Sequence, residues 1–313
     1  SEALHDHILI ADDDTELLEP NGLAPMVGIL NQADVACVAP RLVASIGADP
    51  KIVAGPMILG LAGSAATYVG ESQGLNEAGV YSRLQLSQDV SAVAGHFFLM
   101  KRADWKAAGG FDETIFTVFN CVLDFCLKLN ELGKRHVWTP LTNVLHQGGK
   151  TMEVRCRDIR QKISLAEQEI SERKALHMRW AKRLANDPYY NRHLSLIVPF
   201  DIEADIVVEW QPRRHDRPRV LALPMHSGAG QYRVVEPLNA LQDAGLAQTS
   251  VVLPFGGRKI RLMQPLELVR AAPDRLILQH SVDDGQLSLI DGFKNAAPDI
   301  KIIQTVDDLL GEV

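Results

Sequence analysis

Clusters of cationic residues and long apolar runs are both missing from this chain of 313 residues. Lys and Arg number 32 against 39 Asp and Glu, which gives a net charge of −7. A surface that binds nucleic acid needs clustered Lys and Arg for its phosphate contacts, so this charge argues against such a partner. No apolar stretch reaches the ~20 residues of a membrane span, so the sequence predicts no transmembrane segment.

Cysteine is scarce, and an initiator Met is absent. The 4 cysteines show no Cys-x-x-Cys spacing, which argues against a zinc site and fits a reducing, cytoplasmic compartment. Peripheral association with the inner face of a membrane stays open. The first residues do not carry the pattern of a signal peptide, so none is expected in this stretch. The chain opens and closes close to apolar runs, so we expect a fragment of a longer protein.

What is present is the composition of an ordinary soluble protein, with 46% hydrophobic and 23% charged residues. The length predicts about two domains. Strands are expected at 7–11, 34–40, 87–102 and 136–140, and helices at 22–33, 120–133 and 151–185. After a linker at 211–219, strands at 220–224, 249–254, 275–279 and 301–305 alternate with helices. This alternation predicts an α/β fold with a parallel, Rossmann-like sheet.

Three carboxylates, Asp12, Asp13 and Asp14, follow the first strand in "HILIADDD", whose short apolar run predicts a buried strand that leads into a loop. Like charges packed this closely call for a cation or another positive group. The pattern resembles both the receiver domain of response regulators and the DxD motif of nucleotide-sugar glycosyltransferases. A receiver domain needs a second strand that ends in a phosphoacceptor Asp, and the corresponding "PKIVAGPMILG" has no carboxylate after Lys51. The receiver interpretation fails at that point.

Three later stretches appear in the order that the glycosyltransferase interpretation predicts. They are "DVSAVAGHFFLMKRADWKAAGGFDE", "LDFCLKLNELGKRHVWTPLTNVLH" and "DPYYNRHLS". Together with the acidic loop they resemble the inverting family 2 glycosyltransferases of the GT-A fold, over residues 7–195. The resemblance implies transfer of a sugar from a nucleoside-diphosphate sugar to an acceptor hydroxyl, a hexosyltransferase type of activity. It further implies Mn²⁺ or Mg²⁺, a glycan or lipid-linked glycan acceptor, and a role in surface polysaccharide synthesis.

The resemblance also assigns residues to the donor side of the site. Asp14 would bind the metal, Asp12 the ribose or the metal, and His146 would approach the metal or the diphosphate. Asp13 shares the donor loop as a structural carboxylate. The strands that normally precede this loop and form the nucleotide-base pocket are missing from the chain.

The acceptor side is expected at Asp112 and Glu113, in the turn "GGFDE". His96 stands where the family usually has a small residue and would crowd the same region. Gly109 and Gly110 would form an ordinary turn in any fold.

The expected catalytic base is absent from its usual position. An inverting enzyme needs a base that takes the proton from the acceptor hydroxyl. In "FNCVLDFCLK" the family's first carboxylate is replaced by Val122, or by Cys121 if one residue is inserted, whereas Asp124 retains the second. Valine cannot accept a proton, and a neutral thiol is a poor substitute. Asp124 acting as the base, a catalytically degenerate domain and a sequence error are the three explanations.

The chain's last part resembles the amino-terminal half of a GT-B glycosyltransferase, loosely of family 4. The resemblance rests on "HSGAGQYRVVEPLNAL", "PDRLILQ" and "IKIIQTVDDL". Gly228 and Gly230 would allow a close backbone approach, and the nearby helix start could bind an anion. The candidate residues continue through Gln231, Tyr232 and Arg233. Donor-binding residues of GT-B enzymes lie mainly in the other half, so this part would supply acceptor-side residues.

The predicted organisation is therefore a partial GT-A domain at 1–150, a helical connector and linker at 151–217, and a truncated GT-B half at 218–313. The competing hypothesis is a catalytically degenerate module that binds a glycan or a partner protein. Val122 is the observation that motivates it.

Overall fold

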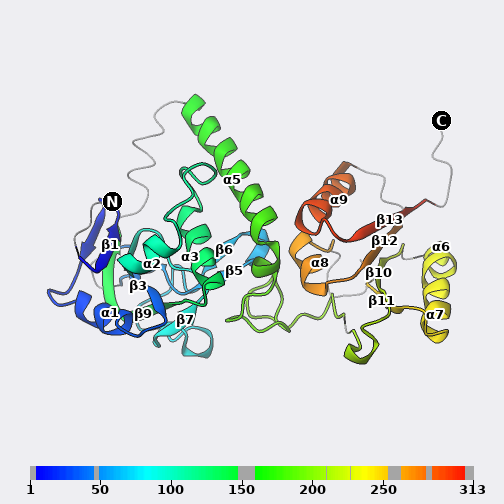
Figure 1. The fold of residues 1–313 in the computed structure, drawn as a ribbon, viewed down its shortest axis with the longest axis horizontal. Helices are drawn as coiled ribbons and strands as arrows, with labels where there is room; N and C mark the ends of the chain where they lie inside the picture. The colour runs from blue at the N-terminus through cyan, green and yellow to red at the C-terminus, as the bar shows by residue number, and fades with distance from the viewer. Residues whose placement is uncertain are drawn as a thin grey trace. The chain divides into compact units, whose positions relative to one another are not determined.

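A computed structural model shows the chain divided into two compact units (Figure 1). It describes residues 5–45, 49–146, 159–208, 210–225, 227–252, 262–279 and 284–306. The first unit comprises Ser1–Trp180 and Asp187–Asn191, and the second comprises Ala181–Asn186 and Arg192–Val313. The predicted domain boundaries at 150 and 217 stay predictions.

The first unit is built on a mixed sheet of seven strands in the order β1-β8-β3-β9-β2, with β4 beside β3 and β7 beside β9. Its central strand β3 pairs in parallel with β9 and antiparallel with β8. All nine residues of β3 are buried, as expected for a strand covered on both faces. The strands are β1 (His7–Ala11), β2 (Thr15–Leu17), β3 (Val35–Val43), β4 (Ile52–Ala54), β7 (Gln88–Val90), β8 (Phe97–Lys101) and β9 (Arg135–His146). A separate hairpin pairs β5 (Met57–Leu59) with β6 (Ala66–Tyr68).

Two strand predictions differ from the structure. The strand before the acidic loop, β1, lies at the end of the sheet order and is partly exposed rather than buried. The strand predicted at 87–102 is two strands, because β7 pairs with β9 whereas β8 pairs with β1 and β3. The chain must leave the sheet between them, and this break places His96 directly before β8.

The helices of the first unit are α1 (Leu23–Leu30), α2 (Arg102–Ala107), α3 (Cys121–Glu131) and most of α5 (Ile159–Ala185). Short 3₁₀ turns occupy Leu61–Gly63 and Val80–Ser82. Gly133 follows α3 with a φ of 74°, the left-handed conformation that glycine provides at helix ends. The predicted start of the long helix, 151–158, lies outside the described residues.

The segment 187–191 returns to the first unit through one buried carboxylate. Asp187 accepts hydrogen bonds from the backbone N–H of Leu59 at 2.8 Å and from Oγ of Ser91 at 2.7 Å. It also accepts one from the N–H of Tyr189 at 2.9 Å. These bonds attach the "DPYYN" segment to the hairpin and to the end of β7.

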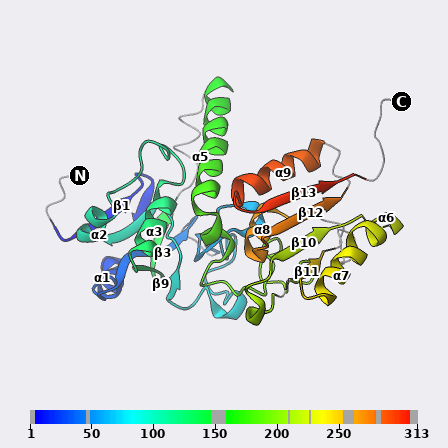
Figure 2. The ribbon, with the colours of Figure 1, turned by 45° about the vertical axis from the view of Figure 1, so that its right-hand side comes forward.

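The second unit is a parallel sheet in the order β11-β10-β12-β13, which confirms the predicted parallel α/β arrangement. Successive residues of β10 face opposite sides, since Leu221 packs with α8 and α9 whereas Val220 and Ala222 pack with η4 and α7. Helices therefore cover both sides of the sheet (Figure 2). The elements are η3 (Pro212–Arg214), β10 (Arg219–Leu223), α6 (Gly228–Gly230), η4 (Gln231–Val235), α7 (Glu236–Asp243), β11 (Gln248–Val251), α8 (Pro265–Ala271), β12 (Arg275–Gln279), α9 (Asp284–Ala296) and β13 (Lys301–Thr305).

Within the described ranges, no helix combines the length and the apolar character that crossing a bilayer requires.

Candidate active site

The acidic loop is fixed between two strands of the first unit. The backbone N–H of Asp12 donates to the carbonyl of His96 at 2.8 Å, and Oγ1 of Thr15 donates to the carbonyl of Asp12 at 2.6 Å. Thr15 in turn pairs with His146 at the end of β9. Three segments that are distant in sequence therefore meet at this loop.

Two carboxylates and two imidazoles face one another at this meeting point. Nδ1 of His96 lies 2.8 Å from Oδ2 of Asp12, and Nε2 of His146 lies 3.4 Å from Oδ1 of Asp14. The two rings stack with centroids 4.4 Å apart. Ligand atoms of Asp12, His96 and His146 all lie within 4.8 Å of one another. Carboxylate oxygens and imidazole nitrogens are common ligands of divalent metals.

Burial keeps His146 in the form that binds metals. Its residue is 7% exposed, and burial, with a smaller contribution from His96, lowers the pKa of His146 against the opposing effect of Asp14 and Asp12. A neutral imidazole is the ligating form. Within the described residues its buried Nδ1 has no hydrogen-bond partner. These residues fit a divalent cation.

A cavity of about 520 Å³ opens beside this cluster. Asp12 and His96 line it, together with Tyr68 of β6, and burial raises the pKa of Tyr68 to about 12. The start of α3 and residues of α5 also line the cavity. Its lining further includes Ser64, Asn120, Cys121, Val122, Glu169 and Arg173.

The position of the expected base carries no proton acceptor. A Cβ built on Gly95 would lie 3.1 Å from Cγ2 of Val122, so this valine packs close to the backbone of Gly95. Burial raises the pKa of the Cys121 thiol, which keeps the thiol protonated. Whichever of Val122 and Cys121 is aligned with the family's carboxylate, neither can act as a base at neutral pH.

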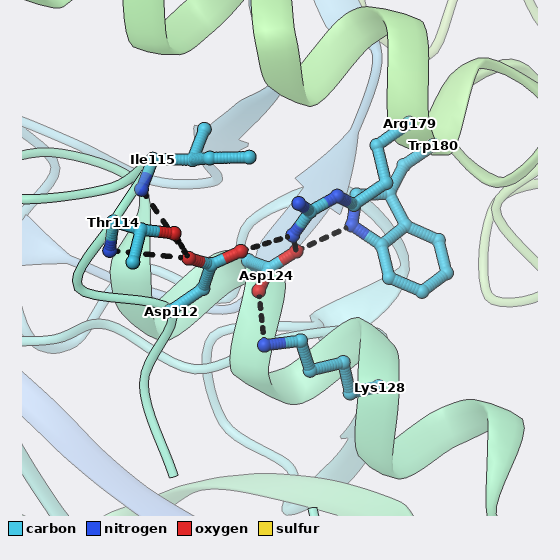
Figure 3. Close-up of polar contacts among 7 residues, drawn as sticks. All are labelled: Asp112, Thr114, Ile115, Asp124, Lys128, Arg179 and Trp180. Atoms are coloured by element: carbon cyan, nitrogen blue, oxygen red, sulfur yellow. Dashed lines mark hydrogen bonds and ion pairs between the residues drawn. The ribbon is translucent and has the colours of Figure 1, made fainter. Parts of the chain in front are cut away.

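Asp124 is held in a network of its own and does not line the cavity (Figure 3). Its side chain is fully buried, and Oδ1 accepts from Nη1 of Arg179 and Nε1 of Trp180, both at 2.8 Å. Oδ2 lies 2.8 Å from Nζ of Lys128, an ion pair that lacks hydrogen-bond geometry. Such contacts suit a structural carboxylate better than a base that must exchange protons.

Arg179 also reaches the predicted acceptor-side residue Asp112, at 2.9 Å (Figure 3). Hydrogen bonds from Thr114, followed by the one from Arg179, hold the pKa of Asp112 well below its usual range. Glu113 and Asp13 are exposed. Neither Asp112 nor Glu113 contributes to the lining of the cavity.

A carboxylate that the sequence did not single out organises the cavity wall. Glu172 of α5 is buried and accepts backbone hydrogen bonds from Thr117 at 3.0 Å, Val118 at 3.1 Å and Phe119 at 2.8 Å. The spacing of Glu169, Glu172 and Arg173 places all three on one side of a helix. That spacing was visible in the sequence, but nothing there connected the helix to the acidic loop.

The candidate residues of the second unit follow β10 in the chain. In the sheet order, β10 lies between β11 and β12. A Cβ on Gly230 would lie 2.0 Å from the carbonyl oxygen of Met225, whereas one on Gly228 would meet nothing within 4 Å. Of Gly228 and Gly230, only Gly230 therefore packs closely against another part of the backbone. Nε2 of Gln231 donates to Glu236 at 2.6 Å.

Tyr232 is 77% exposed, and Arg233 is also exposed. A cavity of about 550 Å³ occurs elsewhere in this unit, lined in part by Arg192, Trp210 and Arg270. It contains none of the predicted site residues.

Cys37, Cys126 and His136 form a second group whose ligand atoms lie close together. All three are fully buried, and Nε2 of His136 contacts the carbonyl of Cys126 at 3.0 Å. Burial raises the pKa of the Cys37 thiol well above its ordinary value and lowers that of His136 to about 4. A protonated thiol is a poor ligand, so this group is best explained as core packing.

No family model matches the chain. The uncharacterized protein y4gI of Sinorhizobium fredii (strain NBRC 101917 / NGR234) is 31% identical over 193 residues, which is 60% of this chain. This chain spans 20% of that relative's length. A crystal structure of GalNAc-T7 with UDP, GalNAc and Mn²⁺ matches 60% of this chain and 37% of its own, with 16% identity and a TM-score of 0.36. A likeness at that TM-score carries no argument about function.

Proposed function

We propose that the first unit is part of a metal-dependent, inverting glycosyltransferase of the GT-A, family 2 type. The observation that carries this proposal is the convergence of Asp12, Asp14, His96 and His146 beside the cavity. The acidic loop, the residue before β8 and the end of β9 supply these side chains. The sequence resemblance implies Asp12, Asp14 and His146 in this chain order, whereas His96 departs from the family.

Mn²⁺ or Mg²⁺ would be held by Asp12, Asp14 and His146. Such a cation neutralises the charge that develops on a diphosphate leaving group. The substrate would be a nucleoside-diphosphate sugar, with the sugar in the adjoining cavity. His96 would position Asp12 through the 2.8 Å contact between Nδ1 and Oδ2.

The wider role is proposed on the sequence resemblance alone. The acceptor would be a glycan or lipid-linked glycan in surface polysaccharide synthesis, at the cytoplasmic face of a membrane. The second unit would be the amino-terminal half of a GT-B enzyme, and its parallel sheet and the close approach at Gly230 agree with that assignment.

A module that binds glycans or partners without catalysis is the second candidate. Val122 in the cavity wall and the enclosed carboxylate of Asp124 favour it. The two candidates differ in whether a bound nucleotide sugar is turned over.

The test measures Mn²⁺ binding by electron paramagnetic resonance and sugar release from UDP-, GDP- and dTDP-sugars, with protein expressed from its complete reading frame. We expect Mn²⁺-dependent turnover and loss of both Mn²⁺ binding and turnover in Asp14→Asn, because the variant removes a charged ligand. The control is Asp6→Asn, whose side chain is 98% exposed. Binding without turnover would favour the binding module, and unchanged Mn²⁺ affinity in Asp14→Asn would refute the proposed site.

A further inference from the structure

The helix α5 brings a carboxylate to the wall of the cavity that the acidic loop also lines. Glu169 and Arg173, four residues apart on α5, both line the cavity that Asp12 and His96 line. Between them, Glu172 anchors this part of α5 through the backbone of residues 117–119. The anchored helix therefore holds Glu169 in the wall of the cavity that Val122 also lines.

Other carboxylates near the cavity are already engaged. Asp12 contacts His96, Asp124 is surrounded by Arg179, Trp180 and Lys128, and Glu172 receives the backbone hydrogen bonds of the neighbouring loop. Glu169 differs, because the structure shows no hydrogen bond or ion pair for its carboxylate within the described ranges. Its residue is exposed to solvent, so a proton taken up there can leave to water.

We propose that Glu169 is the general base that replaces the carboxylate missing at Val122, an inference that rests on the proposed glycosyl transfer. A carboxylate of Glu169 takes the proton of the acceptor hydroxyl as the acceptor oxygen forms its bond to the anomeric carbon. The bond from that carbon to the diphosphate oxygen breaks, and the electron pair leaves on the nucleoside diphosphate. Glu169 then releases its proton to solvent, which restores the carboxylate.

The base thus comes from a different element than the one the sequence resemblance indicates. Val122 and Cys121 at the start of α3 cannot accept the proton, and Asp124 does not line the cavity. Glu169 lies 45 positions after Asp124 in the chain (169 − 124). A substitution at Val122 is compatible with catalysis when a carboxylate reaches the same cavity from α5.

The experiment compares Glu169→Gln with Glu167→Gln in protein expressed from the complete reading frame. Glu167 is exposed on the same helix and does not line the cavity. The probe reactions are Mn²⁺-dependent release of sugar from UDP-, GDP- and dTDP-sugars and transfer to short glycan acceptors. Because a positioned base contributes roughly 10²–10⁴-fold, Glu169→Gln should lower kcat by about that factor at unchanged Mn²⁺ affinity and melting temperature.

Two further readouts separate a base from a structural residue. The fall in kcat/KM at low pH should vanish in Glu169→Gln, and added formate should restore part of the activity of Glu169→Ala. Retained kcat in Glu169→Gln, with Asp14→Asn inactive, would overturn the base assignment and leave the glycosyltransferase proposal intact. Absence of any metal-dependent turnover in the wild type would overturn both.

Discussion

Replacing Asp124 by Asn should destabilise the first unit without removing a catalytic group. The side chain is fully buried and contacts Arg179, Trp180 and Lys128, each at 2.8 Å. An Asn at this position keeps the volume and one acceptor oxygen. It presents an amide N–H₂ group to the ammonium of Lys128 and leaves two cations without their shared anion.

The magnitude follows from burial. Removing one partner from a fully buried ion pair costs about 3–5 kcal/mol. The side chains of Arg179 and Lys128 are 31% and 29% exposed, so water replaces part of the lost interaction. Arg179 also keeps its contact with Asp112 at 2.9 Å. We therefore expect a loss of about 2–3 kcal/mol in the free energy of unfolding, which lies just below that range because water and Asp112 compensate in part.

The assay is equilibrium unfolding in urea at pH 7, followed by tryptophan emission, because Trp180 is part of the network. The midpoint for the first unit should fall while the m-value stays constant, since the area exposed on unfolding is unchanged. At a temperature where the variant is folded, its kcat should match that of the wild type.

The matched control is the exposed pair between Asp6 and Arg102, whose charged atoms lie 3.8 Å apart. Asp6→Asn should change stability by less than about 0.5 kcal/mol, as exposed pairs do. A loss in Asp124→Asn as small as that of the control would refute the argument from burial. A large loss of kcat in fully folded Asp124→Asn would instead indicate that Asp124 is the base.

Two further predictions concern the core and the second unit. Burial lowers the pKa of His136 from 6.5 to about 4, so the unfolded chain binds the proton more tightly than the folded one. The free energy of unfolding should therefore fall by about 3 kcal/mol as the pH drops from 7 to 4. Urea unfolding across that range would show it, and the pH dependence should shrink in His136→Phe. Gly230→Ala should destabilise the second unit by about 1–3 kcal/mol, because its Cβ would lie 2.0 Å from the Met225 oxygen. Gly228→Ala, which meets nothing within 4 Å, should be neutral or stabilising in thermal unfolding, and equal losses in the two variants would contradict the close-approach argument.

Much of the secondary structure could be predicted because it depends on local patterns. The strands β1, β3 and β10, the helix α3 and the alternation in the second unit all appear where the sequence indicated. The error at 87–102 arose because β-propensity does not say which neighbour each half of a run will pair with.

The residues of the candidate site also divide into those that the sequence could predict and those that it could not. Asp12, Asp14 and His146 could be selected because they end apolar runs in a recognisable order. The contact of His96 with Asp12 depends on the break between β7 and β8, and the place of Glu169 depends on how α5 packs. Long-range packing of this kind leaves no signal in a single sequence.

The buried imidazole of His146 in the proposed metal site implies an order of preference among cations. Imidazole nitrogens favour nickel, copper and zinc over magnesium, whereas an all-oxygen site suits magnesium. If the proposed site binds a cation, protein purified on a nickel column would carry nickel there. The proposed transfer activity would then depend on which ion was added last, and preparations stripped with a chelator and reloaded with manganese would differ from those supplied with magnesium.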